Sequence, residues 1–542
     1  MKSGDTESSK RVTYLQYLLL ALVLGTVAYV RVRLLQVPLE RDEGEYAYMG
    51  QLLLDGMPPY AHAYSMKLPG VSIVYALSMA LFGQTPFGIH LGLLIANGIC
   101  IALVYVLASR LFDRDAAFAA CASYAVLSLS KTVYGFFAHA THFIVLFVLA
   151  GCLLLLHHPD RGRSRLLFIS GLCFGLAFTM KQHAALFIIF ALLYLIWGRY
   201  KSEAADGTVS RTGVALFLLG AILPYTLIVL WVLKAGTFAT FWFWTVTYAK
   251  EYASGLSIGQ GVEALIHNFS VIYYPNIPLW LLAGAGALLL LVKKAQCRNR
   301  LFVAGLLCSS FLAICPGFYF RWHYFIILLP AIALLIGAAA TGIGDLLATA
   351  RGGNEWLRRL VPALLIMGAI AYGLYRERSC FFLLPPLEVS YSTYRASAFP
   401  AAPELGRYLR EHTTGDDRIA VLGSEPEIYF YAGRLSATGH IYMYSLMEDQ
   451  PHAEEMQREL IRDIEQSRPK YCVFANMQFS WLRGPYSPDV IFEWFDAYVE
   501  KYYERVGIVD LYDDTSRFVW EPGVAHYAPG GDAHLVIYKR KM

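Results

Sequence analysis

Hydrophobic positions in this chain are grouped into long runs that are separated by short polar loops. A run of about 20 apolar residues is long enough to cross the ~30 Å hydrocarbon core of a bilayer as a helix. The pattern therefore predicts a mainly α, polytopic membrane protein with about eleven transmembrane helices. The first run lacks a small-residue cleavage site, so we expect it to be a retained helix. The predicted spans are residues 12–30, 87–109, 116–133, 140–157, 165–181, 184–199, 211–233, 277–293, 301–316, 322–346 and 358–375.

The polar loops between these runs predict an orientation. With the segment 71–82 read as an interfacial or re-entrant helix, all short basic loops fall on the side of the N-terminus, which the positive-inside rule makes cytoplasmic. The acidic loop at 39–70, the loops at 237–276 and 316–322, and the C-terminal part would then lie outside. The basic loops contain Arg110/Arg114, Arg161–Arg165, Arg199/Lys201/Arg211, Lys293–Arg300 and Arg351–Arg359.

The pattern changes near residue 376, because 376–542 contains no apolar run of membrane length. We expect helices at about 403–411, 452–467 and 489–504, and strands at 418–422, 471–474, 507–511 and 535–539. Alternating strands and helices predict a small α/β domain outside the membrane. The expected domains are thus a transmembrane module, 1–375, whose first outer loop (37–86) carries amphipathic helices, and an extracytoplasmic domain, 376–542.

Composition agrees with this organisation and excludes some functions. Hydrophobic types make up 57% of the residues and charged types 16%, against about 25% charged in soluble proteins. The net charge of +4 is spread along the chain, so we expect no nucleic-acid partner. The nine cysteines form no CxxC pair, and no zinc site is predicted.

The first outer loop, LERDEGEYAYMGQLLLDGMPPYAHAYSMKLPG, is the strongest candidate for chemistry. Its apolar spacing predicts a short amphipathic helix at 43–55 on the membrane surface. Asp42 and Glu43 are candidates for a general base or a metal-binding acid, but Asp42 could equally be the N-cap of this helix. Glu40 and Glu45 are expected on a solvated face. Lys67 could bind a phosphate or extend towards lipid headgroups.

Other polar residues are expected at the outer ends of different helices. Arg321, His323 and Tyr324 form one such group, in which the arginine suits a phosphate or an interfacial anchor. His139 and His142 are spaced to share one helix face, which allows a metal but also fits hydrogen-bonded polar residues. Lys181 and His183 have the same ambiguity, as a substrate or metal site or as ordinary polar residues.

The distribution of these groups favours an enzyme. Acids and cations collect at one membrane face, whereas a transporter would more often place ionisable residues near the midplane. A site at the surface, partly in lipid, suits an enzyme that acts on a lipid-linked substrate. The alternative is a membrane transporter or a lipid flippase.

The segments RDEGEYAYMG (41–50) and KLPG (67–70) resemble the GT-C polytopic glycosyltransferases related to protein O-mannosyltransferases and bacterial aminoarabinose transferases, the glycosyltransferase 39/83-like families. The resemblance implies that Asp42 is the catalytic acidic residue, with Glu43 beside it, and that Lys67 holds a polyprenyl phosphate. It also implies that Tyr324, which precedes Leu329–Pro330, faces the phosphate with help from Arg321.

The resemblance also leaves a divalent metal open. Relatives often have an acidic residue where this chain has AHATH, so no cofactor is assigned. His139, His142, Lys181 and His323 are retained as possible substrate or metal residues.

Together these features predict an inverting hexosyl- or pentosyltransferase. It would move a sugar from an undecaprenyl- or dolichyl-phosphate donor to an acceptor hydroxyl, with Asp42 as the base. The acceptor could be a protein, a lipid or a glycan. We expect a multi-pass plasma (inner) membrane protein with its active site outside.

Overall fold

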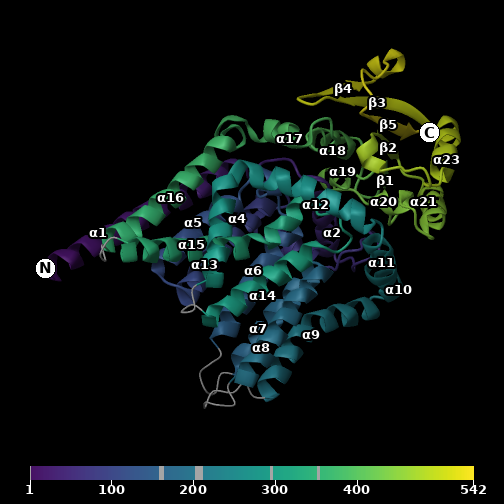
Figure 1. Ribbon diagram of the computed structural model, residues 1–542. Helices are drawn as coiled ribbons and strands as arrows, with labels where there is room; N and C mark the ends of the chain where they lie inside the picture. Colours follow the sequence, from purple (N-terminus) through teal and green to yellow (C-terminus); the bar gives the residue numbers. More distant parts are fainter. Residues whose placement is uncertain (1, 158–163, 202–210, 293–296, 351–354, 542) are drawn as a thin grey trace. The chain divides into compact units, whose positions relative to one another are not determined.

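The structure is a computed structural model that describes residues 2–157, 164–201, 211–292, 297–350 and 355–541 (Figure 1). The chain forms two compact units. Unit 1 consists of Met1–Arg33, Leu91–Ile228 and Leu256–Leu383, and unit 2 consists of Leu34–His90, Val229–Gly255 and Leu384–Met542. Each unit is therefore built from segments that are far apart in the sequence.

Helices are the only regular secondary structure among the described residues of unit 1. Long apolar helices are the expected solution for a chain in lipid, because each backbone polar group is satisfied within its own helix. The helices are α1 (Lys2–Arg33), α4 (Pro86–Leu111), α5 (Arg114–Leu127), η1 (Lys131–Val133), α6 (Ala140–Leu156), α7 (Ser164–Met180), η2 (Gln182–Ala184), α8 (Ala185–Lys201), α9 (Arg211–Lys234), α12 (Ile258–Tyr273), η5 (Tyr274–Asn276), α13 (Ile277–Val292), α14 (Cys297–Ile314), η7 (Trp322–Ile327), α15 (Leu329–Ala350), α16 (Glu355–Arg376) and the π-helix η8 (Ser379–Leu383). Of these, α4 and α9 contain the boundaries with unit 2.

The predicted fold class is confirmed, and a helix lies within each of the eleven predicted spans. Among the described residues, six segments are long and apolar enough to cross a membrane: Arg11–Arg33, Pro86–Leu111, Arg211–Lys234, Ile258–Val292, Leu329–Thr349 and Trp356–Arg376. Five shorter apolar helices are Gly70–Phe82, Ala140–Leu156, Arg165–Met180, Gln182–Trp197 and Arg300–Ile314.

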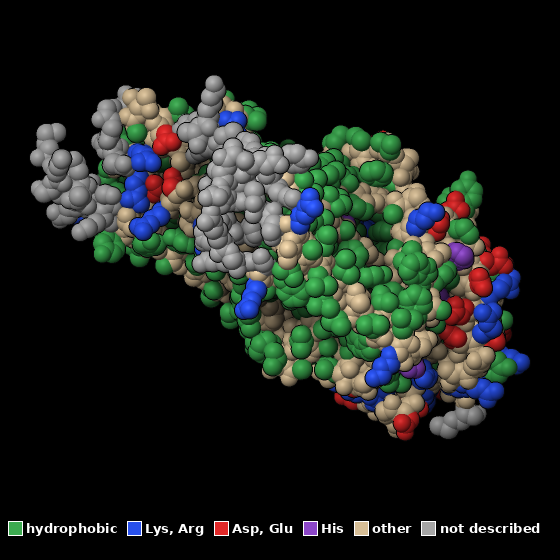
Figure 2. All heavy atoms as spheres, turned by 90° about the horizontal axis from the view of Figure 1, so that it is seen from below, with side chains coloured by type: hydrophobic (Ala, Val, Ile, Leu, Met, Phe, Trp, Pro, Cys, Tyr) green, Lys and Arg blue, Asp and Glu red, His purple; other side chains and the backbone are tan. Residues whose placement is uncertain are grey.

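Hydrophobic side chains are also found on the surface of the protein. On the face shown in Figure 2 they cover a wide area, as expected for a protein that is surrounded by lipid. Parts of the predicted basic loops, at 158–163, 202–210, 293–296 and 351–354, lie outside the described residues. The predicted orientation stays a prediction.

Unit 2 combines short helices with a sheet. Its helices are α2 (Arg41–Leu54), α3 (Gly70–Phe82), α10 (Phe238–Trp242), the π-helix η4 (Phe243–Tyr248), α11 (Ala249–Ala253), α17 (Pro386–Tyr394), α18 (Ala402–Glu411), α19 (Glu427–Ala432), α20 (Tyr444–Met447), α21 (Ala453–Ser467), α22 (Gln478–Trp481), α23 (Val490–Tyr502) and η9 (Gly523–His526). The C-terminal part thus shares a compact unit with the first outer loop. The predicted domain boundary at 375/376 stays a prediction.

The sheet has five strands in the order β1-β2-β5-β3-β4. β1 pairs with β2 in parallel, and the other neighbouring pairs are antiparallel. The helix α23 packs against it, and Phe495 of α23 stacks on Phe474 of β2 at 4.8 Å. Four strands were expected from the sequence, and β4, short and partly polar, was missed. The strands are β1 (Ile419–Leu422), β2 (Tyr471–Asn476), β3 (Tyr503–Leu511), β4 (Ser516–Trp520) and β5 (His534–Arg540).

The helix α2 differs from its prediction as an amphipathic helix on the membrane surface. It begins at Arg41, and most of its residues are buried within unit 2. Glycines allow this close packing: a Cβ at Gly44 would lie 2.5 Å from the backbone nitrogen of Glu427 in α19, and one at Gly50 would lie 2.7 Å from Met79 of α3. The surface prediction was wrong, because α2 packs closely against α3 and α19 and its acids Glu43 and Glu45 are buried.

Candidate functional site

The N-terminus of α2 is closed by Glu40. The Glu40 carboxylate accepts a hydrogen bond from the backbone N–H of Glu43 at 2.9 Å, and Glu43 caps the backbone N–H of Glu40 in return. The alternative that Asp42 is the N-cap is therefore wrong, and so is the expectation that Glu40 lies on a solvated face. Because Glu40 provides the cap, the side chain of Asp42 is available for another partner in the first turn, where the helix dipole favours a carboxylate.

Asp42 forms an ion pair with Lys67. The Lys67 ammonium donates to Asp42 Oδ1 at 3.0 Å and to Glu45 Oε2 at 2.6 Å. The side chains of Asp42 and Glu45 are 17% and 4% exposed. Burial of the ammonium would lower the pKa of Lys67, but Asp42 and Glu45 outweigh it and hold this pKa well above its ordinary value. Lys67 thus stays charged and does not extend to lipid headgroups, and Glu45 is a buried partner instead of a solvated acid.

Glu43 points in a different direction and is completely buried. Its Oε1 lies 2.9 Å from His90 Nε2, and His90 Nδ1 lies 3.0 Å from the carbonyl oxygen of Leu35. His90 belongs to the first turns of α4 and was not identified from the sequence. Glu43 therefore connects α2 to α4 and fixes the turn that carries Asp42.

Arg41 attaches the same turn to the C-terminal part of the chain. Its guanidinium donates to the carbonyl of Ser424 at 2.6 Å, to the hydroxyl of Tyr444 and to Glu425 Oε1 at 3.3 Å. The other carboxylate oxygen of Glu425 accepts from Ser480 at 2.6 Å. Charge-assisted hydrogen bonds of this kind are strong and directional, so they place the turn firmly against residues 424–480.

Two tyrosine rings complete the surroundings of the Lys67 ammonium. The ring centroid of Tyr46 lies 4.7 Å from Nζ and that of Tyr442 lies 5.8 Å from it, within the range of cation–π attraction. Tyr442 is separated from Lys67 by several hundred residues, and no motif indicated it. Sequence reasoning therefore missed His90 and Tyr442, because each reaches the site through tertiary packing alone.

The remaining predicted residues lie in unit 1, where most of them form an aromatic and cationic cluster. The rings of His139 and His323 are stacked with centroids 4.1 Å apart. The Lys181 ammonium lies 4.0 Å above the ring of Tyr324, which also contacts the rings of His323 and His183 edge-on, at 4.8 and 6.0 Å. The structure thus brings together five residues that the sequence placed on three different segments.

Arg321 and His142 lie outside this group of ring contacts. Arg321 is exposed, and its guanidinium lies over the ring of Tyr319 at 5.3 Å. His142 is buried in the first turn of α6. The predicted roles of His139, His142, Lys181 and His323 with a substrate or a metal stay predictions, as does a phosphate shared by Lys67, Arg321 and Tyr324.

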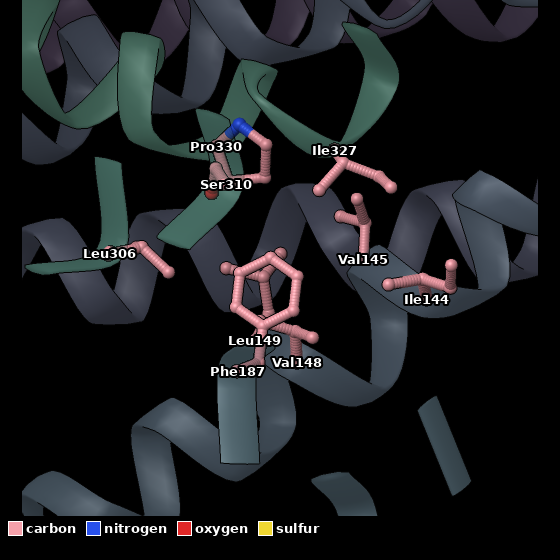
Figure 3. A pocket seen from close by; sticks show the side chains of 9 residues that line it. All are labelled: Ile144, Val145, Val148, Leu149, Phe187, Leu306, Ser310, Ile327 and Pro330. Carbon is pink, nitrogen blue, oxygen red and sulfur yellow. The ribbon is translucent and has the colours of Figure 1, made fainter. Parts of the chain in front are cut away.

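A small apolar cavity opens among helices of unit 1 (Figure 3). It begins a few residues after the cluster on each segment. Ile144 in α6 follows His139, Phe187 in α8 follows His183 of η2, and Ile327 follows Tyr324 in η7. Hydrocarbon groups line it almost completely. The lining residues are Ile144, Val145, Val148, Leu149, Phe187, Leu306, Ser310, Ile327 and Pro330.

Part of the chain is similar in sequence to a known protein family and to known enzymes. Residues 66–231 match the family described as dolichyl-phosphate-mannose-protein mannosyltransferase, a range that includes Lys67 but not Asp42. Two relatives are undecaprenyl phosphate-alpha-4-amino-4-deoxy-L-arabinose arabinosyl transferases. The one from Pseudomonas aeruginosa is 30% identical over 29% of this chain and 31% of its own length, and the one from Pseudomonas paraeruginosa is 29% identical over 38% of each. The chain thus matches about a third of the length of these curated relatives.

Solved structures match over nearly the whole chain. ArnT from Cupriavidus metallidurans, bound to undecaprenyl phosphate, has a TM-score of 0.57 at 14% identity and covers 96% of this chain and 97% of its own. The archaeal oligosaccharyltransferase AglB from Archaeoglobus fulgidus, in complex with an inhibitory peptide and a dolichol-phosphate, has a TM-score of 0.52 at 13% identity, covering 94% and 74%. The GT-C resemblance is confirmed, and the chain has the GT-C fold.

Proposed function

We propose that this GT-C protein is an inverting glycosyltransferase that moves a sugar from a polyprenyl-phosphate donor to an acceptor hydroxyl. The observation that carries the proposal is the ion pair between Asp42, in the first turn of α2, and Lys67. A carboxylate beside an ammonium provides a base for the acceptor and a cation for the leaving phosphate. A phosphate is a good leaving group, so this reaction needs one carboxylate and not two.

Asp42 would act as the base. The Lys67 ammonium and the helix N-terminus both favour the ionised carboxylate, which is the form that accepts a proton. Asp42 is also the more exposed of the two carboxylate partners of Lys67. Glu43, which lies beside it in the sequence, would position Asp42 through His90 and the helix cap.

Lys67 would hold the donor phosphate. Two carboxylates already exceed its single charge, so we infer that a phosphate displaces one of them from the ammonium. Asp42 is the easier one to displace, because Glu45 is more deeply buried and also accepts from Ser65 at 2.5 Å. Donor binding would thus free Asp42 to contact the acceptor hydroxyl, and the base would act when the donor is present.

The unit 1 cluster would serve the lipid-linked donor as well. We assign Arg321 and Tyr324 to the phosphate, with the Lys181 ammonium over the Tyr324 ring as a second cation, since a phosphate needs cations. Relatives that act on mannose and on aminoarabinose leave both a hexose and a pentose as the sugar. The acceptor would be a protein, a lipid or a glycan.

We place the protein in the plasma (inner) membrane with the N-terminus in the cytoplasm and the C-terminal domain, 376–542, outside. Nucleotide sugars are cytosolic, so a site outside the cell requires a donor that is carried on lipid. Membrane-impermeant labelling of single cysteines introduced at exposed positions such as Asp513 and Arg110 would test this. Labelling of the Asp513 position from the cytoplasmic side would overturn the orientation.

The decisive experiment replaces Asp42 in the purified, lipid-reconstituted protein. With a panel of polyprenyl-phosphate sugars, Asp42→Asn should lower kcat by about 10²–10⁴-fold, the contribution of a general base. The matched control is Asp55→Asn at the other end of α2, which should leave kcat unchanged. Full activity of Asp42→Asn would contradict the assignment of Asp42 as the base. Movement of the lipid across liposomes without any transfer product would favour the alternative, a transporter or flippase.

A further inference from the structure

Tyr442 is the exception in an otherwise buried segment of unit 2. Residues 436–447 are all buried except Tyr442, which is half-buried. A tyrosine combines an apolar ring, which packs against its neighbours, with a hydroxyl that can form a hydrogen bond. The position is therefore suited to contact with a ligand.

The segment that carries Tyr442 is fixed on both sides. The backbone N–H of Met443 donates to Ser424 Oγ at 2.9 Å, and the Tyr444 hydroxyl accepts from Arg41 and donates to the carbonyl of Phe479 at 2.7 Å. On the other side, the ring of His440 contacts that of Tyr64 edge-on at 5.1 Å. Hydrogen bonds of the neighbouring residues thus hold Tyr442 in a defined position relative to α2.

The environment of Tyr442 suits an anion. Its ring lies 5.8 Å from the Lys67 ammonium and packs edge-on against Tyr444 at 4.8 Å. Burial, Tyr444 and Asp42 together raise the pKa of Tyr442 well above its usual range, against the opposing effect of Arg41 and Lys67. The phenol therefore stays protonated and can donate a hydrogen bond.

The charges near Lys67 explain why a neutral hydrogen-bond donor would help to bind a phosphate there. Asp42 and Glu45 leave this part of unit 2 with an excess of negative charge, which disfavours a phosphate. A protonated hydroxyl binds a phosphate oxygen by a charge-assisted hydrogen bond and adds no charge of its own.

We propose that Tyr442, from the C-terminal part of the chain, donates a hydrogen bond to the phosphate of the lipid-linked donor held by Lys67. This inference rests on the proposed function, because it takes Lys67 as the phosphate ligand. It makes residues 440–444 part of the donor site.

The test is the binding of undecaprenyl phosphate to the full-length protein, measured as a ligand-dependent shift in thermal unfolding. Tyr442→Phe keeps the ring and removes the hydroxyl, and it should raise Kd about tenfold, the loss expected for one hydrogen bond to a charged group. Tyr442→Ala should raise Kd at least as much. The matched control is Tyr486→Phe at an exposed position of unit 2, which should bind as the unchanged protein does.

A second variant separates this inference from the proposed function. Lys67→Met combined with Glu45→Gln removes the cation and keeps the number of unpaired buried carboxylates low. If this double variant binds undecaprenyl phosphate weakly while Tyr442→Phe binds normally, the role of the hydroxyl is overturned and that of Lys67 stands. If both bind normally, the phosphate site at Lys67 fails and the inference fails with it.

Discussion

Lys67 in unit 2 and Lys181 in unit 1 both place an ammonium close to a tyrosine ring, but their surroundings differ. Lys67 lies between the carboxylates of Asp42 and Glu45, at 3.0 and 2.6 Å, and is buried. Lys181 is half-buried, with its ammonium 4.0 Å above the ring of Tyr324. Breaking a buried ion pair costs about 3–5 kcal/mol, whereas a cation–π contact contributes about 0.5–2 kcal/mol.

This difference separates two kinds of site. In unit 2 the charged groups stabilise one another, so the residues proposed for catalysis are also needed for folding. In unit 1 the histidine and tyrosine rings pack face to face and edge-on, and a cation over a ring can change partners at little cost. The first arrangement holds a base in place until a phosphate displaces it, and the second suits a cation that exchanges partners at little cost.

The largest effect is expected for Lys67→Ala. This change removes the cation between the carboxylates of Asp42 and Glu45, and it should lower the free energy of unfolding by about 3–5 kcal/mol and abolish transfer. Adding Glu45→Gln should restore most of the stability but not the activity. Thermal unfolding and product formation measure the two effects separately. A Lys67→Ala protein that is as stable as the unchanged one would show that this ion pair does not stabilise the fold.

The next prediction concerns Glu427, a buried carboxyl of unit 2 for which neither oxygen has a hydrogen-bond partner on another described residue. Burial, reinforced by Glu425, raises the pKa of Glu427 well above its ordinary value. The folded state then binds a proton that the unfolded state has released, so stability decreases as the pH rises above about 4.3, the unfolded pKa. The slope is at most about 1.4 kcal/mol per pH unit.

Glu427→Gln should remove that slope. Its melting temperature should exceed that of the unchanged protein at pH 8 and approach it at pH 5, because Gln resembles the protonated acid. Glu454→Gln, on the exposed face of α21, is the matched control and should leave the pH profile as it is. Equal pH profiles for Glu427→Gln and the unchanged protein would show that Glu427 ionises freely in the folded state.

A smaller effect is expected for the buried pair of Glu43 and His90. Either Glu43→Ala or His90→Ala should cost about 1–3 kcal/mol, since each leaves a buried polar partner unsatisfied. The double variant should cost less than the sum. If Glu43 positions α2 and does not touch the substrate, Glu43→Gln should keep the donor KM and most of kcat. A loss of kcat in Glu43→Gln as large as that of Asp42→Asn would make Glu43 a catalytic residue.

The sequence predicted those parts of the molecule that depend on local pattern. Apolar length indicated the helices, and the motifs at 41–50 and 67–70 indicated Asp42 and Lys67, which lie 25 residues apart and do form a pair. The partners that complete this pair could not be predicted. Glu45 looked solvated, because an acid on a helix is normally exposed unless a cation reaches it. Tyr442 comes from a segment whose packing on α2 depends on the Arg41 network.

The smallest effect is expected for Lys181→Met, which tests the unit 1 side of the comparison. Methionine keeps the length of the side chain and its contact with the Tyr324 ring but removes the charge, so the free energy of unfolding should change by about 0.5–1 kcal/mol. Lys250→Met at an exposed position is the control for the loss of one positive charge. If Lys181 has a ligand role, undecaprenyl phosphate should bind more weakly to Lys181→Met than to Lys250→Met, although the two proteins differ only slightly in melting temperature. A loss of stability near that of Lys67→Ala would contradict the comparison, because it would make Lys181 part of a buried ion pair and not an exchangeable cation over a ring.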